Sequence, residues 1–273
     1  MDRRLTPFSG RVAHVSLRGQ VAAERFAEGE WRAVAWPLAD LEREPGGARD
    51  RQVLFGDRFL VLDRQGGHVF GQAGKDGYCG WLAEAALGPD IAASHFVAAP
   101  ATHLYPEPRV QARELAGLSL GARLAVEGVE GAFVRTAAGY VPAAHLRPLA
   151  EPMDDPAAVA ALFLGTPYLW GGNSRAGIDC SGLVQAALLA CGIACPGDSD
   201  LQAALGREPA PGEAPARGDL IFWKGHVAIV EGPGMILHAT GHAMAVVREP
   251  LATVTERIAA QGHGPVTARR RTG

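Results

Sequence analysis

A cysteine with two histidines downstream of it gives this sequence the residue types of a thiol hydrolase. Cys180 lies in the run Asp-Cys-Ser-Gly-Leu, directly before the apolar pattern VQAALLACG, so it is expected at the start of a helix. A thiol at that position faces unpaired backbone N–H groups and the positive end of the helix dipole, and both favour the thiolate. Cys180 is therefore the expected nucleophile.

A nucleophilic thiol needs a base within hydrogen-bond reach and a third group that orients the base. The segments HVAIVEG (226–232) and MILHATG (235–241) flank a Gly-Pro-Gly turn signal and are predicted to form a hairpin. Such a hairpin puts His226 and His238 almost opposite one another on one face of the sheet. Taken singly, either histidine would more often be structural. The pair suits a base and its orienting partner better than a metal site, because no third ligand of suitable spacing is evident.

The elements around these residues predict an α+β domain over residues 151–273. EPMDDPAAVAALFLG reads as a helix started by proline, with acidic residues near its N-terminus. The aromatic and glycine-rich loop TPYLWGGNSRAGI, the Cys180 helix and a Pro/Gly-rich crossing follow, and the strands LIFW, HVAIVEG and MILHATG come last. Helices followed by antiparallel strands indicate α+β. The basic end TARRRTG is expected to be a solvated tail.

The first half of the chain repeats weakly and predicts two small β-barrels. Segments beginning at Val53 and Leu118 share apolar residues, a Gly-x-Arg motif, a turn, an apolar strand and a later Gly-Tyr pair. Short alternating strands with glycine-marked turns favour barrels over helices. We expect the first barrel, with an N-terminal extension, over residues 1–88 and the second over residues 89–150. RVAHVSLRG is expected to supply an opening strand.

Composition excludes several classes of function. The 273 residues are 48% hydrophobic and 20% charged, with a formal net charge of -3, so no electrostatic footprint for nucleic acid or anionic lipid is present. No secretory signal or membrane-length apolar stretch is found, and a cytoplasmic location is expected. The cysteines are too few for a disulfide scaffold and fit a reducing compartment. Cys191 and Cys195 lack companion ligands, so buried thiols are favoured over a metal site, and no cofactor is implied.

Four motifs in order, PYLWGG, DCSGL, RGDLIFWKGHVAIV and ILHATG, resemble those of the NlpC/P60 family of papain-like cysteine peptidases. The resemblance covers roughly residues 152–270. The two barrels resemble bacterial SH3-like modules, although any small β-barrel would share the few residues that match. With both parts together, the chain resembles the γ-D-glutamyl-diamino acid endopeptidases (dipeptidyl-peptidase VI type) of cell-wall peptide recycling.

This resemblance implies a role for each candidate catalytic residue. Cys180 matches the nucleophile, His226 the general base and His238 the residue that orients the base. The oxyanion formed by attack on an amide needs hydrogen-bond donors, and the resemblance suggests the Cys180 backbone N–H and the Tyr168 hydroxyl. Without the resemblance, Tyr168 would be interpreted as an aromatic residue packed beside Trp170.

The implied substrate is a free murein peptide such as L-Ala-γ-D-Glu-diamino acid, in which the diamino acid is diaminopimelate or lysine. Its ammonium requires acidic or acceptor groups, and its free α-carboxylate requires hydroxyl or backbone donors. The matching positions are expected to bind the substrate: Asp57 and Tyr78 in the first barrel, and Trp170, Asp179, Ser181, Asp198 and Ser199 in the C-terminal domain. Asp198 and Ser199 could instead cap a helix. Asp57 stands where the relatives more often have glutamate.

Three hypotheses remain at the level of sequence. The first is hydrolysis of the γ-D-glutamyl-diamino acid bond through a thioester. The second keeps the thiol chemistry but cuts a muramoyl amide or transfers an acyl group. The third is a non-catalytic module that binds cell wall or protein. Sequence leaves open the diamino acid preferred, the accepted peptide length and the oligomeric state.

Overall fold

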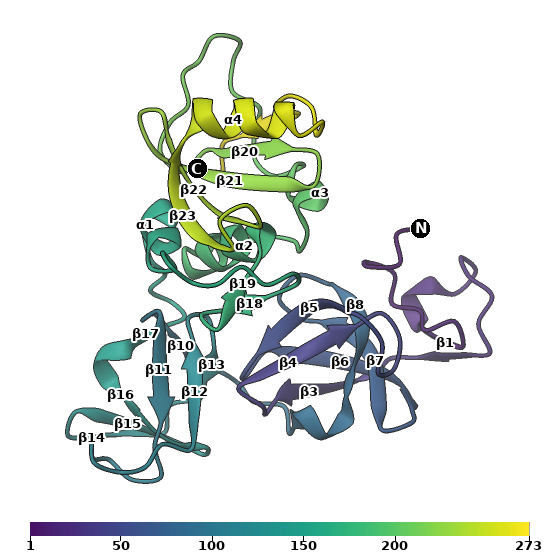
Figure 1. Cartoon of the computed structure of the whole chain (residues 1–273). Helices are drawn as coiled ribbons and strands as arrows, with labels where there is room; N and C mark the ends of the chain where they lie inside the picture. Colours follow the sequence, from purple (N-terminus) through teal and green to yellow (C-terminus); the bar gives the residue numbers. More distant parts are fainter. Residues whose placement is uncertain (273) are drawn as a thin grey trace. The chain divides into compact units, whose positions relative to one another are not determined.

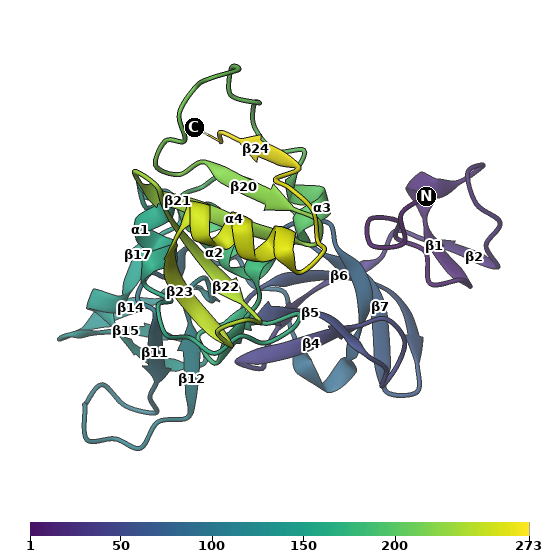
Figure 2. The same ribbon diagram turned by 45° about the horizontal axis from the view of Figure 1, so that its top comes forward.

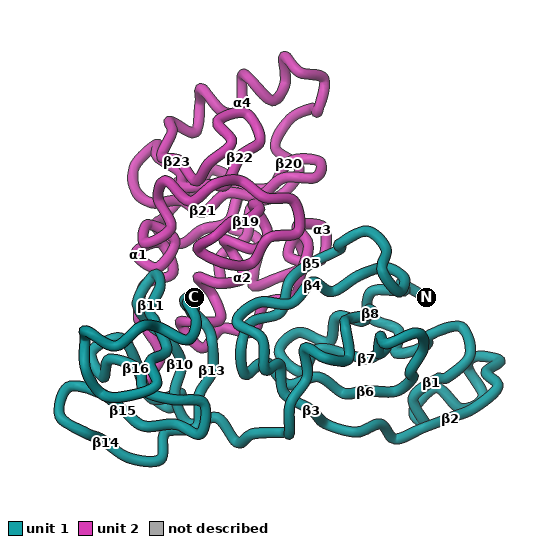
Figure 3. The backbone as a smooth tube through the Cα atoms, turned by 60° about the horizontal axis from the view of Figure 1, so that its bottom comes forward, with its two compact units in different colours: residues 1–150 teal, residues 151–273 magenta. Residues whose placement is uncertain are grey.

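The computed structural model describes residues 1–272, and the chain divides into two compact units, residues 1–150 and residues 151–273 (Figure 3). Unit 1 consists of strands and short 3-10 turns, and unit 2 combines helices with a sheet. Within the described residues, no helix has the length and apolar character needed to span a membrane.

The first barrel of unit 1 is a seven-stranded sheet in the order β5-β4-β8-β7-β6-β3-β9. Its core contains Phe59, Val69 and Leu82, all completely buried, because alternate residues of each strand point inward. The elements of this barrel are β3 (Glu30–Val34), β4 (Leu38–Glu42), β5 (Arg49–Leu54), β6 (Arg58–Gln65), β7 (His68–Ala73), β8 (Cys79–Ala83), η2 (Glu84–Ala86) and β9 (Leu87–Gly88).

The expected opening strand does not enter this barrel. β1 (Val12–His14) instead pairs in parallel with β2 (Arg25–Ala27) in a separate two-stranded sheet (Figure 2). β1 ends early because the His14 side chain accepts a hydrogen bond from the Ser16 N–H and so caps the 3-10 turn η1 (Val15–Leu17). The edge of the barrel sheet is completed by β9, which pairs with β3.

The second barrel is built around a second core cluster with Val97, Leu118, Leu124 and Val141, to which Leu54 of β5 also belongs. Its strands form three small sheets, in the orders β13-β10-β17, β11-β12 and β14-β15-β16. The elements are β10 (His95–Val97), β11 (Ala101–Leu104), β12 (Ala116–Ser119), β13 (Arg123–Leu124), β14 (Gly128–Glu130), β15 (Phe133–Thr136), β16 (Gly139–Pro142), η3 (Ala143–His145) and β17 (Leu146–Pro148).

Backbone conformation explains why the repeated Gly-x-Arg motif begins with glycine in both barrels. Gly56 and Gly121 have φ angles of +77° and +92°, a region that residues with a side chain rarely adopt. A Cβ on Gly56 would also lie 2.0 Å from the carbonyl oxygen of Arg123. The motif therefore marks the same tight turn in each barrel.

Unit 2 is an antiparallel five-stranded sheet, in the order β23-β22-β21-β20-β24, with helices on both faces (Figure 1). Helices α1 and α2 pack against β21 and β22, and Val254 of α4 packs against Ile221 and Trp223 on the opposite face. The elements are α1 (Pro156–Ala161), β18 (Asn173–Ser174), β19 (Gly177–Ile178), α2 (Cys180–Ala190), α3 (Ser199–Gln202), β20 (Leu220–Trp223), β21 (His226–Gly232), β22 (Met235–Thr240), β23 (Ala245–Pro250), α4 (Leu251–Ala260) and β24 (Ala268–Arg270).

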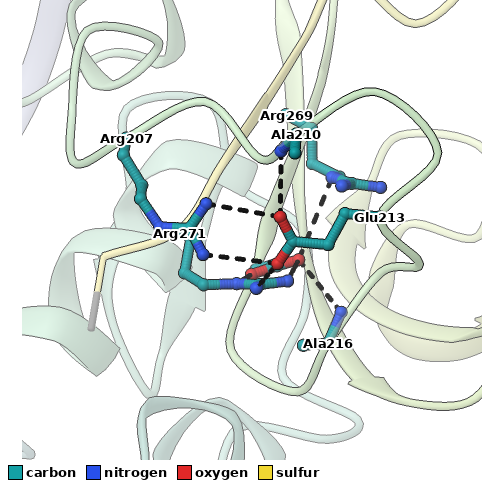
Figure 4. Close-up of polar contacts among 7 residues, drawn as sticks. Arg207, Ala210, Glu213, Ala216, Arg269 and Arg271 are labelled. Carbon is teal, nitrogen blue, oxygen red and sulfur yellow. Dashed lines mark hydrogen bonds and ion pairs between the residues drawn. The ribbon is translucent and has the colours of Figure 1, made fainter.

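The basic end of the chain is an ordered strand, so the expectation of a solvated tail is wrong. β24 pairs with β20, and the guanidinium of Arg271 donates to both oxygens of the fully buried Asp219 at 2.7 and 2.8 Å. Glu213 binds Arg271 and also Arg207 (Figure 4). Buried carboxylates require such partners, and the arginine-rich sequence supplies them.

Candidate active site

The nucleophile candidate lies at the first residue of α2, as the sequence predicts. Asp179 is the N-cap: its Oδ1 accepts hydrogen bonds from the Gly182 N–H at 2.6 Å and from the Ser181 hydroxyl at 2.8 Å. Its Oδ2 accepts a third from the Gly171 N–H at 2.9 Å. One carboxylate thus caps the helix and fixes the glycine-rich loop beside Cys180.

The glycine of the Asp-Cys-Ser-Gly motif allows that loop to lie directly against the helix. A Cβ on Gly182 would lie 2.4 Å from the carbonyl oxygen of Gly172, a distance that real Cβ atoms do not reach. The backbone N–H of Asp179 donates to the same carbonyl at 3.2 Å. Close backbone packing therefore positions the residues on either side of Cys180.

The helix start favours a thiolate at Cys180, as expected, but burial and a nearby charge act against it. Burial, followed by the negative charge of Asp179, raises the pKa of Cys180 to about 12. Backbone N–H groups, among them that of Val227, favour the thiolate but do not outweigh these two effects. The sequence argument left out burial, the largest effect on this thiol, and the negative charge of Asp179 at the helix N-terminus. A base must therefore remove the thiol proton.

The side chains of His226 and His238 are in direct hydrogen-bond contact. His226 Nε2 and His238 Nδ1 lie 2.8 Å apart, and His238 is 1% exposed. The predicted hairpin forms, but its register differs. Ile229 pairs with Leu237, which places Ala228 rather than His226 across from His238. The rings meet diagonally on one face, which their reach allows.

His226 is the first residue of β21, and the next residue directs its N–H at the Cys180 sulfur. Within residues 1–272 the sulfur and the His226 ring form no direct hydrogen bond. Catalytic contacts of this kind commonly tighten when substrate binds. Burial and then His238 lower the pKa of His226 to about 3, so the ring is neutral near pH 7 and has a nitrogen free to accept a proton.

A carboxylate that the sequence analysis missed completes the chain of contacts. His238 Nε2 lies 2.9 Å from Glu249 Oε2, and both carboxylate oxygens of Glu249 accept hydrogen bonds from Arg257, at 2.6 and 2.7 Å. Arg257 is the main cause that lowers the pKa of Glu249 to about 2. The available signal was the run AVVREP, which forms β23 beside β22 but was not predicted as a strand.

Tyr168 lies close to the nucleophile. Burial raises the pKa of its phenol to about 12, and the negative charge of Asp179 contributes in the same direction. Its backbone N–H donates to the Met244 carbonyl oxygen at 2.9 Å, which fixes the loop at this residue. The hydroxyl therefore keeps its proton and can act as a donor. Neighbouring Trp170 is 73% exposed.

A buried glutamine, Gln202, connects the segments that carry three of the expected substrate-binding residues, Ser181, Asp198 and Ser199. The side-chain Nε2 of Gln202 donates to the Ser181 carbonyl oxygen at 2.9 Å and to the Pro196 carbonyl oxygen at 3.1 Å, which ties α3 to the start of α2. α3 begins at Ser199, with Asp198 at the N-cap position and a φ angle of +57°. Within the described residues, Asp198 makes no side-chain capping hydrogen bond. The capping alternative therefore does not explain this strained residue.

The two expected substrate residues of the first barrel lie in its interior. Asp57 is 3% exposed, and its Oδ2 accepts hydrogen bonds from the Leu54 N–H at 2.9 Å and from Lys75 Nζ at 2.7 Å. Tyr78 is 2% exposed and belongs to the barrel core, with the Arg51 guanidinium 5.7 Å from its ring centre. The carboxylate of Asp57 is thus already paired with a lysine. Substrate binding by these residues stays a prediction.

A cavity of about 470 Å³ lies beside the histidines. It is lined by Lys224, Gly225, His226, His238, Thr240, Gly241, His242, Arg257, Ile258, Gln261 and His263. All of these residues belong to unit 2, and those that can carry charge are basic. Both histidines thus border a space large enough for part of a ligand.

Comparisons with known proteins agree with this geometry. The model of the NlpC/P60 family matches residues 165–259, and the model of the bacterial dipeptidyl-peptidase Sh3 domain matches residues 41–87. The γ-D-glutamyl-L-lysine dipeptidyl-peptidase of Bacillus subtilis (strain 168) is 34% identical over 236 residues, which is 76% of each chain. The chain belongs to the NlpC/P60 family. It is a cysteine peptidase with an N-terminal SH3 domain.

Other relatives of this NlpC/P60 peptidase extend the similarity. A γ-D-glutamyl-L-lysine dipeptidyl-peptidase of Bacillus cereus is 28% identical over 237 residues, 75% of this chain and 71% of the relative. The crystal structure of an NlpC/P60 family protein from Bacillus cereus ATCC 10987 has the same fold, with a TM-score of 0.77 and 22% identity over 89% of this chain and 99% of that one. The SH3 match decides between an SH3-like first barrel and an unrelated small barrel.

Proposed function

We propose that this peptidase hydrolyses the bond between γ-D-glutamate and a diamino acid in free murein peptides that begin with L-alanine. The observation that carries the proposal is the direct contact between His226 and His238, next to the Val227 backbone N–H that is directed at the Cys180 sulfur, in a member of this family. Two relatives that align along most of the chain are named for a γ-D-glutamyl-L-lysine activity, which supports the choice of bond.

The reaction we propose begins with transfer of the Cys180 proton to His226. The sulfur then attacks the γ-carbonyl carbon of D-glutamate and forms a tetrahedral oxyanion. Collapse of this intermediate breaks the C–N bond, and His226 gives its proton to the leaving amine of the diamino acid. Water, deprotonated by His226, attacks the thioester in the same way and releases L-Ala-γ-D-Glu. His238 holds the ring of His226 throughout.

The oxyanion donors in this proposal are the backbone N–H of Cys180 and the hydroxyl of Tyr168. Removal of one such donor typically costs a factor of about 10² to 10³ in kcat. The raised pKa of Tyr168 supports the role, because the hydroxyl remains a donor over the working range of pH.

Substrate selection is proposed for the residues around the start of α2. Ser181, Asp198 and Ser199 offer hydroxyl and carboxylate groups for the free α-carboxylate and the ammonium, with Trp170 as an exposed apolar wall. Asp57 would have to exchange Lys75 for the substrate ammonium. A cytoplasmic location, where free wall fragments would be met, remains part of the proposal.

Replacing Cys180 by alanine tests the proposed function. We expect the variant to lose hydrolysis of L-Ala-γ-D-Glu-lysine and L-Ala-γ-D-Glu-diaminopimelate, followed by mass spectrometry of the products, while Cys191→Ala retains it. Cys191 is a matched control because it lies at the other end of the same helix. Undiminished turnover by the Cys180 variant would end the proposal. Products cut at another bond would favour the amidase or acyl-transfer alternative.

A further inference from the structure

The chain of side-chain contacts behind the nucleophile does not stop at the third residue. It continues from His238 to Glu249 on β23 and to Arg257 on α4, with every step between 2.6 and 2.9 Å. Each residue comes from a different element, and His238 at its centre is almost completely buried. A structural ion pair alone would not require a direct contact with the histidine.

We propose that Glu249 is a positioning residue for catalysis, which acts through His238 to hold both histidines in the tautomers that leave a free nitrogen on His226. This inference rests on the proposed function for the identity of the base. Glu249 is then a fourth residue that acts in catalysis, after Cys180, His226 and His238. Arg257 acts by holding the Glu249 carboxylate.

The argument follows the protons from one ring to the next. An ionised carboxylate can only accept hydrogen bonds, so His238 must carry its proton on Nε2 and donate it to Glu249. Nδ1 of the neutral His238 then has a lone pair and accepts. The 2.8 Å contact therefore requires His226 to carry its proton on Nε2. Nδ1 of His226 is left without a proton, as a base for the thiol.

Arg257 keeps the carboxylate ionised and in place. Its two nitrogens bind both oxygens of Glu249, a fork geometry that fixes the plane of the carboxylate. The pKa of Glu249 lies far below neutral, so the carboxylate has no proton to donate to His238. Reversal of the tautomers is therefore excluded while the pair is intact.

Among the groups within residues 1–272 that act most strongly on His238, Glu249 is the acidic one. Burial first lowers the pKa of His238, and Arg257 and His242 lower it further, whereas Glu249 raises it. The cavity beside the rings also has Lys224 and His263 in its lining. Loss of the carboxylate would leave a basic environment in which a developing imidazolium is less stable.

The first test observes the tautomers directly by ¹⁵N NMR of the full chain labelled at histidine. In the unmodified protein we expect His238 to be protonated at Nε2 and His226 to have a bare Nδ1. Glu249→Ala should mix the two tautomers of His238. Because that variant leaves Arg257 without its partner, Glu249→Leu combined with Arg257→Met removes both charges and should fold and show the same mixing.

The second test measures kinetics with a γ-D-glutamyl-lysine peptide. We expect Glu249→Ala to lower kcat about 10- to 100-fold, the range found when the partner that orients a metal-binding histidine is removed, with little change in KM. In a His238→Ala background the same substitution should have no further effect, because Glu249 acts only through that ring.

Glu231→Gln is the matched control. It breaks the ion pair between Glu231 and Arg248, which joins β21 to β23 in the same sheet without touching either histidine. Tautomers and kcat should be unchanged. A bare Nε2 on His238 in the unmodified protein, unaltered tautomers in both Glu249 variants, or an equal loss of kcat in the His238→Ala background would each overturn the inference. If the proposed function fails instead, no turnover is seen but the NMR result stands.

Discussion

Replacing Asp179 by asparagine separates the two roles that this carboxylate has beside the nucleophile. As an N-cap it holds Gly182, Ser181 and Gly171, and as a charge it raises the pKa of the Cys180 thiol. Asparagine keeps one acceptor oxygen for the helix but turns an NH₂ group toward the Gly171 N–H. It also removes the negative charge.

The expected loss of stability follows from the three hydrogen bonds. A buried donor left without an acceptor costs about 1 to 3 kcal/mol, so the free energy of unfolding should fall by about 2 kcal/mol in Asp179→Asn. Alanine loses all three contacts and the cap, which adds about 1 to 2 kcal/mol more. At about 2 °C for each kcal/mol in a chain of 273 residues, the asparagine variant should melt roughly 4 °C lower.

The thiol should respond in the opposite sense and become more reactive. Removal of the carboxylate lowers the pKa of Cys180, since its charge is the second cause of the raised value. Each unit of pKa increases the thiolate fraction near pH 7 about tenfold. A less stable protein with a faster-reacting thiol is therefore expected.

The assay is the rate of iodoacetamide alkylation at Cys180, followed by peptide mass spectrometry under native conditions, together with thermal melting. Asp155→Ala is the control, because Asp155 caps α1 through Ala157 and Ala158 and should lower stability alone. Slower or unchanged alkylation in Asp179→Asn, with the same loss of stability, would refute the electrostatic part of the reasoning.

Three further predictions follow from packing and charge. Gly182→Ala should lower melting temperature and kcat together, because its Cβ would collide with the Gly172 carbonyl; circular dichroism and turnover check this. Asp219→Asn should lower the free energy of unfolding by about 3 kcal/mol in urea titrations, because Arg271 loses a buried charge partner, and an unchanged midpoint would contradict it. The lowered pKa of His226 makes the unfolded state bind more protons between pH 6.5 and about 3, so stability should fall as pH decreases through that window, and His226→Gln should flatten the slope.

Local signals were sufficient for the elements that hold the nucleophile. The start of α2 at Cys180 follows from Asp179 as a cap before an apolar helical run, and the β21–β22 hairpin follows from two apolar runs around a turn. Gly56 and Gly121 marked turns because only glycine adopts their positive φ angles at low cost. These features depend on neighbours within a few residues.

Tertiary structure decided the features that depend on residues distant in sequence. The raised pKa of Cys180 arises mainly from burial, which outweighs the helix end and cannot be read from one segment. The contact between His238 and Glu249 depends on the pairing of β22 with β23. The C-terminal segment is ordered because Arg271 binds Asp219, which is distant in sequence. Sequence alone was thus sufficient to name the thiol and the imidazoles of the candidate site. Only the fold decided their protonation and their further partners, because desolvation and long-range charge pairs exist only once the elements have packed.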